Sequence, residues 1–163
     1  MPKEKIRCSW CLKDDLYKNY HDEEWGKPLH DDQKLFALLC LEGAQAGLSW
    51  YTVLSKRENY RKAFDNFDAV KMSKYSQARI ERLLQNEGII RNRLKVHAFV
   101  TNAKAYLDIQ KEFGSFDKYI WSFVNGKPIV NKWNSLGQIA PTTKESDALS
   151  KDLIKRGFKF VGS

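Results

Sequence analysis

The sequence contains little of what marks secreted or membrane-bound proteins. It has three cysteines in 163 residues, an odd number that argues against a secreted disulfide scaffold. The longest apolar runs, such as Phe36 to Leu41, fall far short of the roughly 18 residues that a membrane-spanning helix needs. Residues 1–7 are rich in charge, and no apolar signal-peptide segment follows them. We therefore expect a cytoplasmic protein that does not contact a membrane.

Linkers and repeats are also missing. The chain has no internal repeat and no low-complexity segment, and its four prolines are scattered. One domain is expected for about 150 residues, so residues 1–163 are predicted to form a single domain. A chain of this size buries about 68–70% of its unfolded surface, which is enough for a hydrophobic core.

Acidic residues are in the minority. Lys and Arg number 28 against 20 Asp and Glu, so the net charge is +8 and the isoelectric point is near 9.3. Such a surface favours polyanions, nucleic acid first and an anionic membrane face second, although charge alone does not decide between them. Aromatic residues make up 13% of the chain, either as a packed core or as platforms on which bases stack.

The apolar residues recur with helical spacing almost throughout, which predicts an all-α protein. The expected helices are 15–22, 32–45 after Asp31 and Asp32, 50–64 after Ser49, a short turn after Asp68, a helix after Ser76, 92–113 ended by Gly114, 116–124 after Ser115, and a helix that begins at a Thr142–Glu145 capping box and runs to Arg156 before Gly157. Residues 129–140 are expected to form a loop. The long helix is expected to bury Leu94, Val96, Ala98, Phe99, Ala103 and Leu107.

A helical hairpin is expected around Gly88, which is suited to a left-handed helix C-cap. A short turn that opens a helix exposes unpaired backbone N–H groups, and these groups bind phosphate well. Arg91, Arg93 and Lys95 add positive charge beside this turn. The alternative is an ordinary helical hairpin with a solvated basic end.

Glu42 lies in an otherwise apolar stretch, either at a helix edge facing water or turned inward. An inward carboxylate needs partners, and a cationic or hydrogen-bond-donating ligand would provide them. Gly47 and Leu48 follow in a tight turn. Leu48 either inserts between bases as a wedge or packs into the core.

Two further groups of residues could bind ligands. Cys8, Cys11 and His21 suggest a redox pair or half of a zinc site, with His30 as a further candidate ligand, or free thiols. Aromatic residues near loops surround Glu42 in the sequence, and an aromatic cage with a carboxylate suits a flat cationic ligand. These residues are Trp10, Tyr17, Tyr20, Trp25, Trp50 and Tyr51.

Four segments together resemble the DNA-3-methyladenine glycosylase I family of bacterial alkylation-repair enzymes. They are Cys8-Ser9-Trp10, residues 17–26 (YKNYHDEEWG), residues 41–50 (LEGAQAGLSW) and residues 157–162 (GFKFVG). The two longer blocks are highly specific, and the resemblance runs from about residue 7 to the last residue. It implies a helix-hairpin-helix glycosylase fold in a single compact helical unit, with the hairpin around Gly88.

The resemblance also implies a site and a reaction. Glu42 would be the catalytic residue that hydrogen-bonds the base, Tyr20 and Trp50 would stack on its two faces, Tyr17 would add a polar contact and Trp10 would line the pocket. Gly47 and Leu48 would fill the gap left when a damaged nucleotide flips out of the duplex.

The enzyme implied by the resemblance is a monomer that acts on alkylated double-stranded DNA, releases free 3-methyladenine, and has no lyase lysine and no general base. The alternative is a catalytically inactive DNA-binding module on the same fold. The presence of Glu42, Tyr20 and Trp50 favours the enzyme.

Zinc is a conditional expectation from the same resemblance. The family holds a structural zinc with an N-terminal Cys and His and a C-terminal His and Cys. Cys8 and His21 match the first pair, whereas Cys11 matches no ligand position. The chain stops at Gly162-Ser163, where the family continues, so the second pair is absent and two ligands alone would bind weakly.

Overall fold

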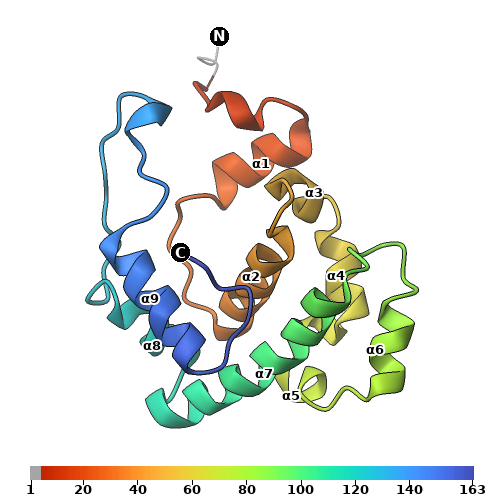
Figure 1. The fold of residues 1–163 in the computed structure, drawn as a ribbon. Coiled ribbons are helices and arrows are strands. Elements are labelled where there is room, and N and C mark those ends of the chain that lie inside the picture. The colour runs from red at the N-terminus through yellow and green to blue at the C-terminus, as the bar shows by residue number, and fades with distance from the viewer. Residues whose placement is uncertain (1–4) are drawn as a thin grey trace.

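The computed structural model describes residues 5–163, and every regular element among them is helical (Figure 1). The predicted all-α fold in one compact unit is therefore confirmed. In chain order the helices are η1 (Ser9–Cys11), α1 (Asp15–Glu23), α2 (Asp32–Gln45), α3 (Trp50–Leu54), α4 (Arg57–Ala63), η2 (Asp65–Phe67), α5 (Ala69–Met72), α6 (Gln77–Leu83), α7 (Arg93–Phe113), α8 (Phe116–Ser122), η3 (Leu136–Gln138) and α9 (Lys144–Lys155).

Helices α2 and α7 contact each other in the middle of the molecule and organise the rest. Helix α2 also contacts α3 and α8, and α7 contacts α5, α6 and α8. Their shared core is rich in aromatic rings, as in the contacts of Phe64 with Phe99 and of Phe36 with Tyr106, at 4.7 and 4.6 Å between ring centroids. No helix among residues 5–163 is both long and apolar enough to cross a membrane.

Helix starts follow local capping chemistry. At eight α-helices a side-chain oxygen of the N-cap residue accepts a hydrogen bond from a backbone N–H three residues later, which satisfies a group that the helix leaves unpaired. The predicted caps Asp31, Ser49, Asp68, Ser76 and Ser115 are confirmed. The predicted Thr142–Glu145 capping box is displaced by one residue: Thr143 and Ser146 form it, because the Ser146 hydroxyl reaches back to the Thr143 N–H at 2.8 Å.

The predicted helix 50–64 is two helices, α3 and α4, separated at Ser55 and Lys56. The Ser55 hydroxyl donates to the Thr52 carbonyl at 3.0 Å, and Lys56 N–H donates to Val53 at 3.0 Å, in a tighter turn than an α-helix makes. The break lets both pieces bury apolar residues, including Val53 and Tyr60. The predicted helix 116–124 likewise ends early, at Ser122.

Helix α7 runs over the predicted residues and ends at Gly114, whose φ of +83° closes the helix in the left-handed conformation. Val96, Ala98, Phe99 and Ala103 are buried and Leu107 is half-buried, as expected. The prediction for Leu94 is wrong, because this side chain is 71% exposed and its neighbour Lys95 is buried instead. Position 95 lies three and four residues before Ala98 and Phe99, on the same helix face.

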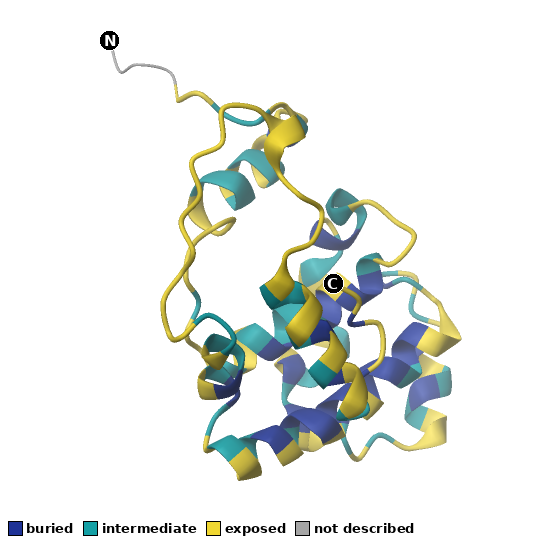
Figure 2. Ribbon diagram, turned by 60° about the vertical axis from the view of Figure 1, so that its left-hand side comes forward, coloured by how far each residue is buried: buried dark blue, intermediate teal, exposed yellow. Residues whose placement is uncertain are grey.

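Burial is uneven across the molecule (Figure 2). Helix α1 has no buried residue, whereas α7 has ten. Residues 125–143 are exposed and irregular apart from the short η3 turn, so the predicted loop at 129–140 is confirmed. The N-terminal part of the fold is thus held to the core by a limited set of contacts, which the site depends on.

Candidate active site and nucleic-acid interface

The predicted aromatic residues of the N-terminal part lie together. The Trp10 ring, presented by η1, lies 5.0 Å from Tyr17 and 5.2 Å from Trp25, centroid to centroid, and 6.4 Å from Tyr20. Tyr17, Tyr20 and Trp25 all come from α1 or the turn after it, so the Trp10 ring packs η1 against this helix. We call Trp10, Tyr17, Tyr20, Trp25, Trp50 and Tyr51 the aromatic cluster.

Tyr20 of α1 and Trp50 of α3 contact each other and both line a cavity of about 650 Å³, which Trp25 and Leu38 also line. Their ring centroids are 5.5 Å apart and the rings are tilted by 46°. A base held between two rings needs two stacking steps of about 3.4 Å each, or about 7 Å in all. The two rings therefore have to part by more than 1 Å before a base can stack on both.

A hydrogen-bonded pair attaches α1 to α3 at the edge of the aromatic cluster. The Tyr51 hydroxyl donates to the Asp14 carboxylate, which also accepts the Tyr17 N–H at 2.9 Å and so caps α1. These two hydrogen bonds hold the pKa of Asp14 below its ordinary value. Asp14 was not among the predicted site residues, although an Asp before a helical pattern is a recognisable N-cap signal.

Glu42 lies in the last turns of α2 and makes no hydrogen bond or ion pair with any residue between 5 and 163. Its side chain is exposed to solvent and lines a recess of about 940 Å³, which Leu48 and Phe160 also line. Desolvation by the surrounding protein raises the pKa of Glu42. The carboxylate is thus available to a ligand that carries donors or positive charge.

Glu42 and the Tyr20–Trp50 pair line two neighbouring cavities, and Leu38 lines both. The Glu42 carboxylate and the Tyr20 side chain interact electrostatically. Burial, followed by the negative charge of Glu42, raises the pKa of Tyr20 to about 12. The structure thus brings Glu42 close to Tyr20 and Trp50, while Glu42 and the ring pair line different cavities that share Leu38. One cage around Glu42 stays a prediction.

Gly47 and Leu48 form the exposed turn that follows α2. Ala46 has φ and ψ of −45° and 118°, Gly47 has a φ of +76°, and the Leu48 N–H donates to the Gln45 carbonyl at 2.6 Å, as in a type II turn. Leu48 is 42% exposed, so it does not pack into the core as the alternative interpretation required. The turn presents an apolar side chain to the outside, as a wedge between bases requires.

The turn between α6 and α7, residues 84–92, forms the expected helical hairpin, but Gly88 acts differently from the prediction. Its φ is not positive, and α6 ends at Leu84 in the right-handed helical conformation. A Cβ at position 88 would lie 3.0 Å from the Asn86 side-chain oxygen and 3.1 Å from the Asn59 side chain. Glycine is needed here for close packing rather than for a left-handed cap.

Three of the N–H groups around Gly88 are already hydrogen-bonded within the chain. The Gly88 N–H donates to the Asn86 side chain at 2.8 Å, the Ile89 N–H to the Asn86 carbonyl, and the Ile90 N–H to the Tyr60 hydroxyl at 3.1 Å. These three groups are thus satisfied within the chain. A phosphate near this turn would depend on other donors.

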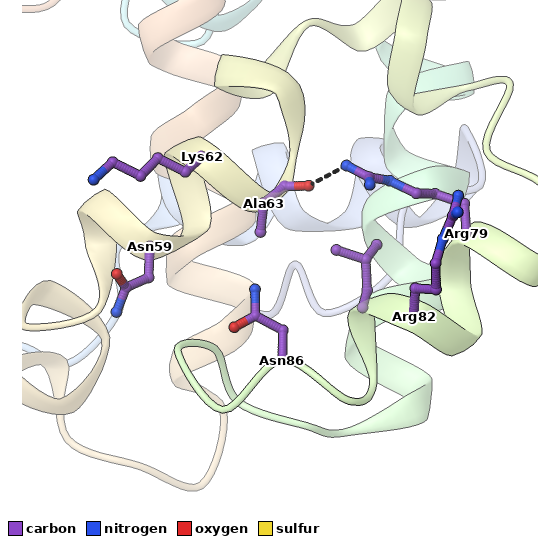
Figure 3. Close-up of a pocket in the computed structure, with 7 residues that line it drawn as sticks. Asn59, Lys62, Ala63, Arg79, Arg82 and Asn86 are labelled. Atoms are coloured by element: carbon purple, nitrogen blue, oxygen red, sulfur yellow. Dashed lines mark hydrogen bonds between the residues drawn. The ribbon is translucent and has the colours of Figure 1, made fainter.

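The basic residues of the hairpin are partly neutralised. Arg93 forms a two-pronged ion pair with Glu81 at 2.5 and 3.1 Å, and Arg91 lies 3.9 Å from Glu87. A basic cleft of about 360 Å³ opens beside the hairpin, with Arg79 donating to the Ala63 carbonyl at 2.9 Å (Figure 3). Its lining residues are Asn59, Lys62, Ala63, Arg79, Arg82, Leu83 and Asn86.

Cys8 and His21, the two expected zinc ligands, are neighbours in space. The Cys8 N–H lies 3.5 Å from His21 Nε2, and the Asp22 carboxylate lies 3.0 Å from Nδ1 of the same ring. Among residues 5–163 no group of three or more His, Cys, Asp or Glu side chains could hold a metal ion. Cys8 and His21 would be at most two of the four ligands that a tetrahedral zinc site needs. All three cysteines are free, and Cys11 is buried.

Comparison with known proteins identifies the family. The model of the methyladenine glycosylase family matches residues 10–163. The chain belongs to the methyladenine glycosylase family. It is 53% identical to DNA-3-methyladenine glycosylase 1 of Escherichia coli K12 and 54% identical to DNA-3-methyladenine glycosylase of Haemophilus influenzae, over 96% of this chain and 84% of each relative.

Solved structures of methyladenine glycosylases have the same fold. A crystal structure of 3-methyladenine DNA glycosylase I matches with a TM-score of 0.93 and 52% identity, over 96% of this chain and 86% of that one. The Staphylococcus aureus enzyme, solved to explain 3-methyladenine recognition, matches with a TM-score of 0.93 and 42% identity, over 96% and 83% of the two chains. A variant of 3-methyladenine DNA glycosylase I in complex with 3-methyladenine matches with a TM-score of 0.92 and 42% identity, over 96% and 84%.

Proposed function

We propose that this methyladenine glycosylase removes 3-methyladenine from alkylated duplex DNA by hydrolysing the N-glycosidic bond, with no lyase step. The observation that carries the proposal is the Glu42 carboxylate, which has no partner among residues 5–163 and lies beside an aromatic cluster. A carboxylate without an ion-pair partner is free to attract a positively charged ligand. A cationic base with an exocyclic amine would satisfy it.

The chemistry of the lesion suits this arrangement. Methylation at N3 gives adenine a positive charge, so the base leaves with the electrons of the glycosidic bond and becomes neutral. A strong general acid is then unnecessary. Aromatic faces and a carboxylate attract the cation, whereas unmodified adenine gains no comparable attraction. Water adds to the sugar carbon and releases its proton to solvent.

Base flipping would bring the damaged nucleotide to Tyr20 and Trp50, with Leu48 filling the space left in the duplex. The exposure of Leu48 at the tip of its turn supports this role. Tyr17 and Trp10, which contact each other at 5.0 Å, would line the inner side of the site. Stacking on both faces requires Tyr20 and Trp50 to move apart, so we expect the base to be bound by induced fit.

Several finer expectations belong to the same proposal. The partner is double-stranded DNA, with contacts at Gly47, Leu48, Gly88, Arg91 and Arg93, and the protein acts as a monomer in the cytoplasm. The net charge of +8 supports a polyanionic partner. Structural zinc stays a conditional expectation at Cys8 and His21, because a stable site needs further ligands. Native mass spectrometry of the metal content would test it.

The deciding experiment is the release of free 3-methyladenine from methylated duplex DNA by this 163-residue chain, detected by mass spectrometry. We expect release by the wild type and by Asp108→Ala, which changes an exposed carboxylate on α7, and none by Glu42→Ala. Bulk DNA affinity should be similar for all three proteins. DNA binding without release by the folded wild type would favour the alternative, a catalytically inactive DNA-binding module.

A further inference from the structure

Lys95 is a buried cation with an unusual set of partners. It is the third residue of α7, directly after the hairpin, and only 7% of its surface is exposed. Its ammonium donates to the Ala44 carbonyl at 2.8 Å and to the Ala46 carbonyl at 2.6 Å. Both acceptors lie at the C-terminal end of α2, so one side chain ties two distant segments together.

The C-terminal end of a helix needs such a partner. Its last carbonyls have no intrahelical donors, and the helix dipole places partial negative charge there. Two of these carbonyls accept hydrogen bonds from nearby backbone groups: the Ala46 N–H donates to the Gly43 carbonyl, and the Leu48 N–H donates to the Gln45 carbonyl. The Ala44 and Ala46 carbonyls flank Gln45 and receive the Lys95 ammonium instead. Lys95 therefore fixes the segment from which the Gly47–Leu48 turn projects.

The other end of this connection lies in the hairpin. The Lys95 N–H donates to the Asn92 side chain at 3.1 Å, and this hydrogen bond caps α7. Two residues before Asn92, the Ile90 N–H is anchored on the buried Tyr60. The hairpin and the end of α2 are thus joined through Lys95, and Glu42 lies only two residues before the first tethered carbonyl.

We propose that Lys95 is a positioning residue that sets the Leu48 turn, and with it the end of α2 that carries Glu42, against the α6–α7 hairpin. This inference rests on the proposed function, in which Leu48 enters the duplex. DNA seated near the hairpin then meets the Leu48 side chain at a fixed distance. Without the ammonium, the turn is free to shift, and the insertion that accompanies base flipping becomes slow.

The test compares substrates that do and do not need the wedge. Lys95→Met keeps the apolar stem and removes the donors, and it is assayed on methylated poly(dA)·poly(dT) and on methylated poly(dA) alone. We expect a loss of about 10- to 100-fold in kcat on the duplex, as a displacement of about 1 Å can cause, and less than about 3-fold on the single strand. Lys104→Met, on the exposed side of α7, is the matched control.

A double-mutant cycle assigns the effect to the turn. If Lys95 acts through Leu48, the duplex losses of Lys95→Met and Leu48→Ala will not add in the double variant. If kcat fell equally on the duplex and on the single strand, and in proportion to the fall in melting temperature, Lys95 would have only a structural role and the proposal would be overturned. Additive losses would overturn it too. Lys95→Gln, which keeps two N–H donors but removes the positive charge and shortens the side chain, replaces the Met variant if that protein does not fold.

Hydrogen exchange separates this proposal from the proposed function. The Leu48 amide should exchange faster in Lys95→Met than in the wild type, while amides in the middle of α7 remain protected. An unchanged Leu48 rate would contradict the positioning role. If the wild type released no base from either polymer, the proposed function would fail, and the exchange result would still show whether Lys95 fixes the turn.

Discussion

The aromatic cluster and the α6–α7 hairpin are built in opposite ways. The cluster stands on α1, a helix with no buried residue, and is held by ring contacts and by the Tyr51–Asp14 hydrogen bond. The hairpin leads into α7, which has ten buried residues, and its central N–H groups all have partners. Figure 2 shows this contrast as exposed and half-buried ribbon around α1 and buried ribbon along α7.

The difference follows from what each region has to do in the proposed reaction. Ring contacts cost little to break and re-form, so Tyr20 and Trp50 can separate to admit a base. A hairpin whose central N–H groups are hydrogen-bonded rearranges less easily, because each lost bond would leave a buried or half-buried donor unpaired. The molecule thus combines an adaptable recognition surface with a rigid support.

The largest difference between the two regions is expected from two tyrosines, Tyr20 in the aromatic cluster and Tyr60, which accepts a hydrogen bond from the hairpin. Tyr20→Leu removes an aromatic face worth about 1–3 kcal/mol, so the affinity for free 3-methyladenine should fall by about 5- to 150-fold with little change in melting temperature. Tyr60→Phe leaves the Ile90 N–H unpaired, which should cost about 1–3 kcal/mol of stability and leave base affinity unchanged. Calorimetry and thermal melts measure both. Equal stability losses would contradict the contrast.

Gly47 and Gly88 are needed for different reasons, the first for its backbone conformation and the second for close packing. Gly47→Ala should cost about 1–2 kcal/mol through its φ of +76°, since a Cβ there meets no atom within 4 Å, and Gly47→Asn should cost less. Gly88→Ala should cost about 1–3 kcal/mol through crowding against Asn59 and Asn86, and Gly88→Asn more. Denaturant titrations distinguish the two patterns. Relief by Asn at both positions would show that crowding is not the cause at Gly88.

The Glu42 carboxylate should reduce stability at neutral pH. Its pKa is raised in the folded chain by desolvation, so the native state binds this proton more tightly than the unfolded chain. The resulting stability is present below the ordinary value of 4.5 and is lost as pH rises through the folded pKa. Glu42→Gln should therefore melt only slightly higher than the wild type at pH 7, because water around the exposed side chain screens much of the effect, although the variant no longer excises the base. The gain should disappear in acid, and a gain of equal size at pH 4 would contradict this cause.

The smallest effect is expected at the two hairpin arginines. Arg91→Gln should reduce the slope of log affinity for DNA against log salt by about 1 if the side chain contacts a phosphate. Arg93→Gln should reduce it less, because Glu81 already holds the Arg93 guanidinium at two atoms. Binding titrations at several salt concentrations measure both slopes. If neutralising both arginines leaves the slope unchanged, neither lies near a phosphate.

Much of the secondary structure could be predicted because its signals are local. Caps such as Ser49 and Ser115 and the closing Gly114 depend on hydrogen bonds within a few residues of the chain. The errors occur where two local hydrogen-bonding patterns of similar strength compete. Examples are the displacement of the capping box to Thr143 and the break between α3 and α4 at Ser55. The candidate site residues were found through long sequence blocks, which identify residues without placing them in space.

Local sequence patterns were enough to predict the helical class, most helix starts and the residue types that could recognise a methylated base. Only the packing of α2 against α7 decided that Lys95 is buried while Leu94 is exposed, since helix periodicity alone does not say which face meets a neighbour. The same packing placed Glu42 and the Tyr20–Trp50 pair in the walls of two neighbouring cavities that share Leu38. These features depend on contacts between residues far apart in the chain, and no local pattern encodes them.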